Sequence, residues 1–196
     1  YELPLRLVGS EMCIRDRIVT GSPHGVYEDH SWIPVVSDLI KNIYKDSLPI
    51  FGVCFGHQLI AQALGGHVEK STKGWGLGLH TYQINNKTGY MSNLLEEVTL
   101  NICHQDQVLR LPEGATVYAK SEFCENAGFY IKDKVLTMQA HPEFLVNFIK
   151  DLLSARRDIT IPKEFVDPAL IKLKAKPESV QSAQFAETIR QFFKLS

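Results

Sequence analysis

Apolar positions in the first third of the chain follow two different spacings. Short continuous runs in RIVTGSP (17–23) and LPIFGVC (48–54) predict two strands, the first of which ends where Gly-Ser-Pro breaks the pattern. EDHSWIPVVSDLIKNIY (28–44) and HQLIAQALGG (57–66) place apolar residues at helical spacing, and a glycine pair ends the second helix. This strand–helix–strand–helix order predicts parallel strands joined by crossover helices.

The first predicted helix has expected start signals and an expected core residue. Asp29 or Ser31 is expected to cap its N-terminus, and Pro34 suits its first turn. We expect Trp32 to anchor this helix in the core, because large aromatic side chains dominate core burial. The apolar residues at helical spacing are Trp32, Val35, Val36, Leu39, Ile40 and Ile43.

The pattern changes in the middle of the chain, where short alternating segments are separated by turn residues. These segments predict strands, some of them antiparallel. They are GWGLGLHTYQIN (74–85), VTLNICH (98–104), ATVYAKSE (115–122), AGFYIKD (127–133) and KVLTMQAH (134–141). After them, FLVNFIKDLLSARR (144–157) predicts a helix, and 168–175 and 179–194 add one or two amphipathic helices. The fold class is therefore α/β.

The N-terminal end does not fit this pattern. Residues 1–16 show no clean period and no convincing helix caps, and VGSEMCIRDR (8–17) resembles a peptide that arises when sequencing-adapter DNA is translated. Our hypothesis is that part of this end is not natural sequence, and that the domain spans residues 17–196. An uninterrupted native reading frame at the source locus would contradict it.

Composition narrows the function classes. A chain of 196 residues fits one domain with a substantial core, and 44% hydrophobic with 22% charged residues argues against a disordered chain. The net charge of −1 gives no reason to expect a nucleic acid or an anionic membrane as partner. No apolar stretch is long enough to span a bilayer.

Cysteine and histidine spacing argues against disulfide and metal frameworks. The four cysteines are widely spaced without a C-x-x-C pair, which favours a reducing, cytoplasmic compartment. The seven histidines form no metal-ligand motif, so we expect no metal and no cofactor.

One cysteine lies at a glycine-flanked corner. In GVCFG (52–56), Cys54 follows an apolar strand and precedes a helix, with glycines on both sides. Glycines permit a sharp strand-to-helix turn that lifts the central side chain out of the sheet, and the helix N-terminus stabilises a thiolate there. The Phe55 backbone N–H would then point at a developing oxyanion. A packed turn with a buried thiol explains the pentapeptide equally well, so both readings stay open at this point.

A candidate base lies in MQAHPEF (138–144). His141 ends a predicted strand, and Glu143 follows two residues later with a stiff proline between them. Such a carboxylate can hold one ring nitrogen, so that the other accepts the thiol proton. A lone histidine here would be a satisfied strand-end residue, but its pairing with the cysteine corner favours a catalytic role.

These motifs together resemble a known family. GVCFGHQ followed by HPE is similar to a class I glutamine amidotransferase domain, and four segments match in order: TGSPHGVYEDHSWI, GVCFGHQLIAQALGG, HQDQVLRLPEGATVYAKSE and QAHPEF. The resemblance covers about 17–144 and is strongest to stand-alone, GMP-synthase-like members, including γ-glutamyl peptidase-like proteins. It implies a flavodoxin-like, three-layer, mostly parallel sheet with helices on both faces and a small antiparallel excursion. It also implies that the family's N-terminal strand and helix are missing here.

The resemblance implies a catalytic set. Cys54 would be the nucleophile, His141 the general base and acid, and Glu143 the carboxylate that orients the histidine. The oxyanion would be held by the backbone N–H groups of Phe55 and of Ser22 in the Gly-Ser-Pro turn.

The resemblance also implies a binding site for glutamine. Gln58 would lie beside the substrate, and His104 and Gln105 would line the pocket around its α-amino and α-carboxylate groups. Asp106 would support that loop, with a contact to the substrate amine as the alternative.

Other chemically capable residues have structural interpretations. We expect His57 to take part in helix packing rather than to act as a second base. We expect Cys103 to be a buried thiol, and the basic residues of SARRDITIPK (154–163) to form a solvated face.

The implied reaction is cleavage of a γ-glutamyl amide through a thioester, with release of ammonia or an amine. Two enzyme functions remain open. One is a subunit that donates ammonia to a synthetase partner; the other is a free-standing γ-glutamyl hydrolase, which the stand-alone resemblance favours. The alternative from another class is a catalytically impaired or regulatory binding module. Turnover of glutamine, compared with that of γ-glutamyl dipeptides and glutathione conjugates, would distinguish them.

Overall fold

The computed structural model describes residues 17–175 and 180–195 of the chain. The hypothesis about residues 1–16, and the expectation that an N-terminal strand and helix are missing, lie outside the described residues. Among the described helices, none has the length and apolar composition needed to cross a membrane.

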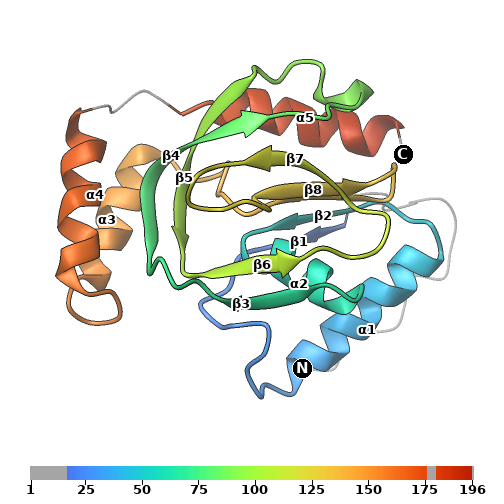
Figure 1. Cartoon of the computed structure of the whole chain (residues 1–196), viewed down its shortest axis with the longest axis horizontal. Coiled ribbons are helices and arrows are strands. Elements are labelled where there is room, and N and C mark those ends of the chain that lie inside the picture. Colours follow the sequence, from blue (N-terminus) through green and yellow to red (C-terminus); the bar gives the residue numbers. More distant parts are fainter. Residues whose placement is uncertain (1–16, 176–179, 196) are drawn as a thin grey trace, which may run out of the picture.

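The described residues form strands, α-helices and one short 3₁₀ helix. Figure 1 shows how the strands and α-helices are arranged. In chain order they are β1 (Ile18–Val19), α1 (Trp32–Lys45), β2 (Ile50–Val53), α2 (Phe55–Ala63), β3 (His67–Lys70), β4 (Gly76–Ile84), η1 (Gly89–Met91), β5 (Glu97–His104), β6 (Asp106–Arg110), β7 (Thr116–Lys120), β8 (Gly128–Ile131), β9 (Val135–Met138), α3 (Val146–Arg156), α4 (Lys163–Ala175) and α5 (Ser182–Leu195).

Seven of the described strands form the main sheet, in the order β1-β2-β9-β8-β7-β4-β5. The pairs β1–β2 and β2–β9 are parallel, and the other four neighbouring pairs are antiparallel. The α/β class is confirmed, but the antiparallel part is larger than the small excursion that we predicted. Connections without a helix join β7, β8 and β9, and a parallel arrangement would need a longer crossover.

The short strands β3 and β6 were not predicted. They pair antiparallel in a separate two-stranded sheet, which covers part of α2. Both strands carry charged residues on exposed positions, so their sequences lack a clear apolar alternation.

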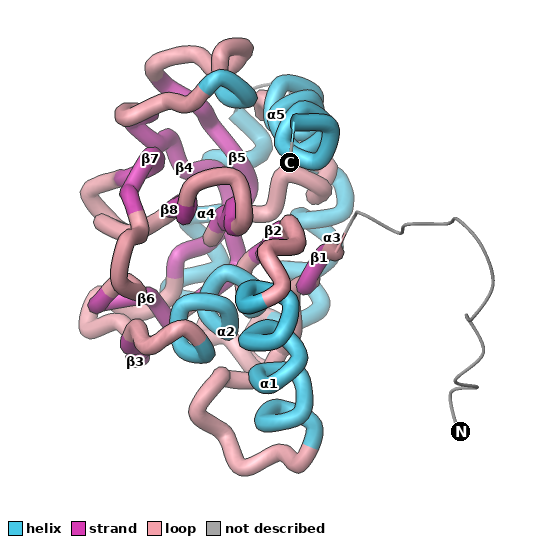
Figure 2. The backbone as a smooth tube through the Cα atoms, turned by 90° about the vertical axis from the view of Figure 1, so that its right-hand side faces the viewer, coloured by secondary structure: helices cyan, strands magenta, loops and turns pink. Residues whose placement is uncertain are grey.

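Side chains alternate across the central strands and create two cores. Ile50 of β2 and Val135 of β9 pack in the core under α1 and α2. Their neighbours Phe51 and Leu136 point to the opposite face, into the core that α5 covers with Phe185 and other apolar side chains. Figures 1 and 2 accordingly show α5 and the α1–α2 pair on opposite sides of β1 and β2, which confirms the three-layer arrangement.

A third apolar cluster lies at the side of the sheet. Helices α3 and α4 pack together and against β4, through buried residues such as Leu77, Ile149 and Leu173. This packing fixes the C-terminal end of α3 next to the strand edge that carries Cys103.

The buried face of α1 differs from the predicted one. Ile33, Ile40 and Ile43 are buried, whereas Trp32 is 37% exposed and stands at the surface beside Phe55. Trp32 is therefore not a core anchor. Ser31 takes the N-cap position as predicted, but within the described residues its side chain forms no capping hydrogen bond.

Candidate active site

Cys54 occupies a sharp corner between β2 and α2. Its backbone has φ +50° and ψ −104°, a conformation that L-residues rarely adopt. The Cys54 N–H donates to the Met138 carbonyl at 2.9 Å, and the Cys54 carbonyl accepts from the Gln58 N–H at 3.1 Å. The corner is thus held on one side by the sheet and on the other by the first turn of α2.

The two flanking glycines are required by close backbone contacts. A Cβ on Gly56 would lie 1.9 Å from the carbonyl oxygen of Val19 in β1. A Cβ on Gly52 would lie 2.7 Å from the carbonyl group of Gly56. The glycines of G-x-C-x-G therefore let β1, β2 and α2 approach one another closely at Cys54. This close approach favours a corner that positions the cysteine over an ordinary packed turn.

His141 follows the strand next to Cys54 and is held on three sides. Its N–H donates to the Asn101 carbonyl at 2.9 Å, and its ring stacks on Phe144 with centroids 3.8 Å apart. The ring Nδ1 lies 2.7 Å from Glu143 Oε1. A carboxylate can only accept here, so in the neutral ring Nδ1 carries the proton and Nε2 keeps its lone pair.

The loop after β1 brings the cysteine and the histidine together. A Cβ built on Gly21 would lie 3.0 Å from His141 Cε1 and 3.9 Å from Cys54 Cβ. Both side chains therefore border the same small volume beside Gly21, and both line one cavity of about 290 Å³.

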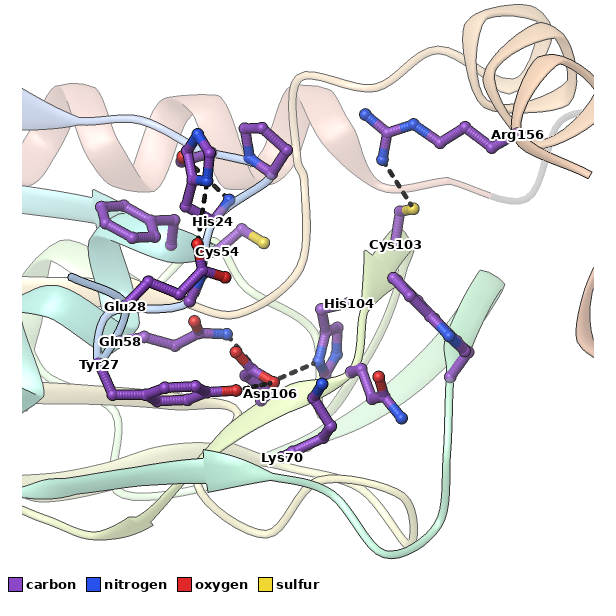
Figure 3. A pocket seen from close by; sticks show the side chains of 16 residues that line it. His24, Tyr27, Glu28, Cys54, Gln58, Lys70, Cys103, His104, Asp106 and Arg156 are labelled. Atoms are coloured by element: carbon purple, nitrogen blue, oxygen red, sulfur yellow. Dashed lines mark hydrogen bonds and ion pairs between the residues drawn. The ribbon is translucent and has the colours of Figure 1, made fainter. Parts of the chain in front are cut away.

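Cys54 lines two neighbouring cavities. The first, which we call the Gln58 cavity, has a volume of about 180 Å³ and is lined mainly by polar groups (Figure 3). The second, which we call the His141 cavity, is the one of about 290 Å³. The residues common to both are Ser22, Pro23, Cys54, Cys103 and Arg156.

The Gln58 cavity contains fixed polar groups. Gln58 uses its amide nitrogen to donate to the Asp106 carbonyl at 2.9 Å and to Gln139 Oε1 at 3.0 Å, so its own amide oxygen remains as an acceptor. His104 Nδ1 donates to the Asp106 carbonyl at 3.0 Å, and its buried Nε2 has no hydrogen-bond partner among the described residues. Burial lowers the pKa of His104 to about 3, so the ring is neutral.

The electrostatics at Cys54 differ from the expected stabilised thiolate. Burial raises the pKa of the Cys54 thiol to about 12, with a further increase from Cys103 and an opposing hydrogen bond from Phe55. A helix N-terminus stabilises a charge by at most ~2 kcal/mol, a change in pKa of about 1.5. Burial therefore outweighs the helix, and the resting thiol is protonated at neutral pH.

This protonation state predicts a slow, pH-dependent alkylation. Without substrate, iodoacetamide should modify Cys54 more slowly than free cysteine near about pH 8, because the free thiol has a pKa of about 8.5. The ionised fraction grows as pH approaches the raised pKa, so the rate should keep rising above about pH 9. Peptide mass mapping follows Cys54 separately from the other thiols. A rate that is already constant at neutral pH would contradict a protonated resting thiol.

All eight predicted site residues line these two cavities. Ser22, Cys54, Phe55, Gln58, His104 and Gln105 line the Gln58 cavity. Ser22, Cys54, His141 and Glu143 line the His141 cavity. Asp106 supports the loop as expected, since its carbonyl accepts from both Gln58 and His104.

The structural roles expected for His57, Cys103 and Arg156 can be compared with their positions. His57 is fully buried and its Nδ1 lies 2.9 Å from Thr137 Oγ1, outside both cavities, which confirms a packing role. Cys103 is only partly buried and lines both cavities, and Arg156 is half-buried beside it rather than on a solvated face. Both predictions about Cys103 and Arg156 were therefore wrong.

Tyr27 and Glu28 also line the Gln58 cavity and were missed. They lie in the segment VYED, which contributed to the family resemblance but carried no assigned role. The Tyr27 hydroxyl donates to Asp106 Oδ1 at 3.1 Å, and Glu28 accepts from the Gly25 N–H at 2.8 Å. These contacts fasten the loop that carries Ser22.

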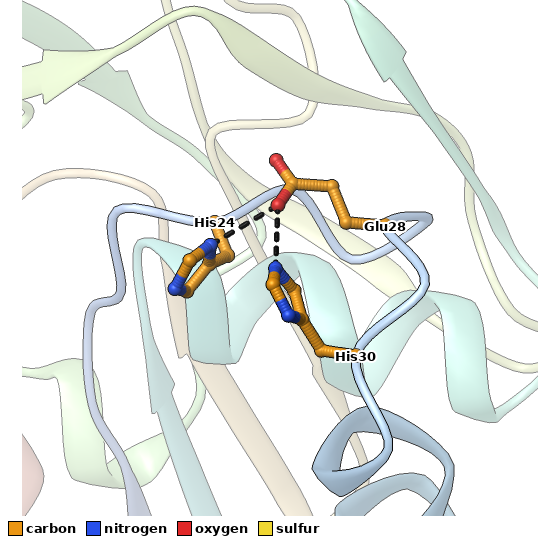
Figure 4. A group of neighbouring side chains, drawn as sticks. All are labelled: His24, Glu28 and His30. Carbon is orange, nitrogen blue, oxygen red and sulfur yellow. Dashed lines mark hydrogen bonds and ion pairs between the residues drawn. The ribbon is translucent and has the colours of Figure 1, made fainter.

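His24 and His30 both contact Glu28, as Figure 4 shows, and His24 and Glu28 line the Gln58 cavity. His24 Nδ1 and His30 Nε2 lie 3.1 and 2.9 Å from Glu28 Oε2, and the two ring centroids are 4.1 Å apart. These three side chains are the described group whose donor atoms, within 4.8 Å of one another, could hold a metal ion. Their hydrogen bonds also account for their positions without an ion. The spacing H-x₃-E-x-H was not recognised from the sequence.

The chain is similar to known glutamine amidotransferases and γ-glutamyl peptidases. The family model described as glutamine amidotransferase class-I matches residues 7–151. Gamma-glutamyl peptidase 4 of Arabidopsis thaliana is 38% identical over 141 residues, which cover 69% of this chain and 56% of the relative. Gamma-glutamyl peptidase 3 of the same plant is 32% identical and covers 83% of this chain and 69% of the relative.

More distant similarities agree with the fold. A GMP synthase of Finegoldia magna is 29% identical over 80% of this chain, which corresponds to 31% of that protein. The crystal structure of a glutamine amidotransferase from Thermotoga maritima superposes with a TM-score of 0.76 at 22% identity, covering 90% of this chain and 78% of that one. The chain thus spans little more than half the length of the first of the curated relatives.

Proposed function

The chain belongs to the class-I glutamine amidotransferase family, and we propose from this that it hydrolyses γ-glutamyl amide bonds through a Cys54 thioester. One observation carries the proposal: a buried thiol on a glycine-flanked corner borders the same cavity as a histidine whose other nitrogen is held by a carboxylate. The reaction class follows from those groups, because a nucleophile, its base and an orienting acceptor suffice for acyl transfer.

The first half of the reaction makes the thioester. His141 Nε2 takes the thiol proton as Cys54 Sγ attacks the γ-carbonyl carbon, and the carbonyl oxygen becomes an oxyanion held by the N–H groups of Phe55 and Ser22. His141 then gives that proton to the leaving nitrogen as the C–N bond breaks. Ammonia or an amine leaves, and the γ-glutamyl group stays on sulfur.

The second half uses the same groups on water. His141 Nε2 takes a proton from a water molecule that attacks the thioester carbon, and the C–S bond breaks. The proton returns to sulfur, which restores the neutral thiol that burial favours. Free glutamate is the product whether ammonia or an amine leaves in the first half.

The glutamyl head fits the Gln58 cavity by charge. Carboxylates of Glu28 and Asp106 line it and can accept from an α-ammonium group, together with the amide oxygen of Gln58. His104 and Gln105 line the same cavity, and in this proposal they contact the head group.

The experiment is a substrate panel with the purified chain. Glutamate release from glutamine, from γ-glutamyl dipeptides and from glutathione conjugates should show direct turnover without a partner, as the names of the peptidase relatives suggest. Turnover of glutamine alone, and only with an added synthetase, would favour the ammonia-donating subunit. No turnover of any compound would favour a binding or regulatory module.

Glu143 provides a graded test of the histidine's role. Glu143→Gln should lower kcat by about 10–100-fold with little change in KM, a part of the 10²–10⁴-fold that acid–base catalysis contributes. The amide can present a donor to Nδ1, which favours the wrong ring tautomer. Because Glu143 is half exposed, the fold should tolerate the change. Glu113→Gln, an exposed carboxylate outside both cavities, is the matched control, and an equal loss in both variants would contradict the assignment.

A further inference from the structure

The His141 cavity has more room than ammonia needs. A cavity holds one water molecule when about 10–15 Å³ is open to it, and ammonia is of similar size. The His141 cavity measures about 290 Å³. It therefore has room for a leaving group of several heavy atoms.

This cavity lies on the leaving-group side of the cysteine. The general acid must reach the leaving nitrogen, and His141 and Glu143 line the His141 cavity but not the Gln58 cavity. In the proposed function, the polar Gln58 cavity holds the acyl part of the substrate. The leaving amine thus departs past His141.

One face of α3 forms the wall of the His141 cavity. Phe148, Leu152 and Arg156 are spaced four residues apart, so they follow one another along the same side of the helix, and all three line the cavity. Phe148 also packs edge-on against Phe144, which stacks on the His141 ring. The wall is apolar near the histidine and ends in a cation at the last residue of α3.

Arg156 has no carboxylate partner among the described residues. Its guanidinium contacts Cys103 Sγ at 3.9 Å, and Figure 3 shows the side chain reaching from α3 toward that sulfur. Its neighbour Arg157, in contrast, forms two hydrogen bonds with Asp167 at 2.7 and 2.9 Å. A half-buried guanidinium that faces a cavity, and whose hydrogen-bond contact among the described residues is with a sulfur atom, is suited to bind a ligand carboxylate in bidentate fashion.

We propose that the His141 cavity binds the leaving part of a γ-glutamyl amino acid, with Arg156 contacting its α-carboxylate and Phe148 and Leu152 contacting an apolar side chain. This proposal rests on the proposed function and names the substrate class of the same site. An amino acid joined through its α-nitrogen has its carboxylate two bonds away from that nitrogen. The carboxylate is therefore held close to the reacting atoms, where Arg156 lines both cavities.

The test compares three substrates in two variants of α3. γ-Glutamyl-leucine has the carboxylate, γ-glutamyl-leucine amide lacks it, and glutamine has no leaving residue. Arg156→Gln removes the guanidinium, and Lys150→Gln removes one positive charge from another face of the same helix, outside both cavities.

Arg156→Gln should lower kcat/KM for γ-glutamyl-leucine by about 10–100-fold, the effect of losing one hydrogen-bonded charge contact. The same variant should change kcat/KM for γ-glutamyl-leucine amide and for glutamine by less than about threefold. Neither compound has the leaving-residue carboxylate that the Arg156 guanidinium would contact, so no contact is lost. Lys150→Gln should leave all three substrates near wild type.

Other results would overturn either the proposed subsite or the proposed function. An equal loss with glutamine would place Arg156 on the glutamyl head or the cysteine and overturn the proposed subsite. An unchanged rate with γ-glutamyl-leucine would also overturn it, while glutamine turnover would leave the proposed function intact. A wild-type chain that cleaves none of the three compounds would instead contradict the proposed function itself.

Discussion

Replacing Cys54 with alanine is expected to abolish hydrolysis of glutamine and of γ-glutamyl dipeptides, with a loss of at least ~10⁴-fold in kcat. In the proposed reaction no other group can take the place of the sulfur. His141 and the backbone N–H groups of Phe55 and Ser22 could still polarise the substrate and activate water, but without the covalent intermediate. Glutamate release measured over long incubations is the readout.

The variant should remain folded, which makes the result interpretable. Cys54 already has a positive φ, and alanine adopts the same backbone at a similar cost. Cys124→Ala is the matched control, because Cys124 is also a buried thiol but lines neither cavity. Thermal unfolding should show one transition in each variant. Activity near wild type in Cys54→Ala would refute the nucleophile, and equal loss in Cys124→Ala would indicate a structural effect.

A second readout reports the intermediate. Acid quenching during turnover should trap a γ-glutamyl group on the wild-type protein, and peptide mapping should locate it on Cys54. The thiol is neutral at rest, so this adduct forms only when His141 removes the proton during attack. A trapped group on any other residue would contradict the proposed chemistry even if Cys54→Ala is inactive.

The sequence predicted those parts of the site that local chemistry determines. Gly52, Cys54 and Gly56 lie within five residues, and the contact between Gly52 and Gly56 follows from the strand-to-helix turn that this segment predicts. The contact of Gly56 with Val19 depends in addition on β1. His141 and Glu143 are two residues apart and form their 2.7 Å contact within one turn. Such short-range constraints can be recognised without the rest of the fold.

The missed features depend on contacts between distant segments. Arg156 became part of the site because α4 and β4 fix the end of α3 beside Cys103, whereas its neighbours in sequence, Ala155 and Arg157, are exposed. Trp32 fits the apolar spacing of its helix equally well as a core or a surface residue. Only the packing of α1 on α2 selects Ile33 instead. The same reasoning applies to strand direction, which short alternating segments do not specify.

Replacing Gly56 with alanine should disturb both stability and activity. In an open helical position this change would be favourable by up to ~1 kcal/mol. Here the added Cβ would lie 1.9 Å from the Val19 carbonyl oxygen and 2.6 Å from its carbon, and both belong to backbone that cannot rotate away. Either β1 or the first turn of α2 must move. We expect a net loss of at least ~3 kcal/mol, which lowers Tm by roughly 6–12 °C in a domain of this size.

The displacement should also reach the catalytic groups. Val19 is paired with Gly52 beside the cysteine, and β1 leads directly to Gly21, where a Cβ would already be 3.0 Å from the His141 ring. A shift of β1 therefore moves the Ser22 N–H relative to the oxyanion and changes the space between Cys54 and His141. Activity measured well below the lowered Tm should still fall by about 10²-fold, because a misplacement of ~1 Å has that effect.

Gly89→Ala is the matched control for this prediction. Gly89 begins η1, has no positive φ, and a Cβ there would meet no atom of the described residues within 4 Å. The same added methyl group should therefore leave Tm and kcat near wild type or raise Tm slightly. If Gly56→Ala behaved like Gly89→Ala, the close approach of β1 and α2 would be absent in solution. The corner would then lack the constraint that holds Cys54 in its strained backbone, and the assignment of the glycines to the site would fail with it.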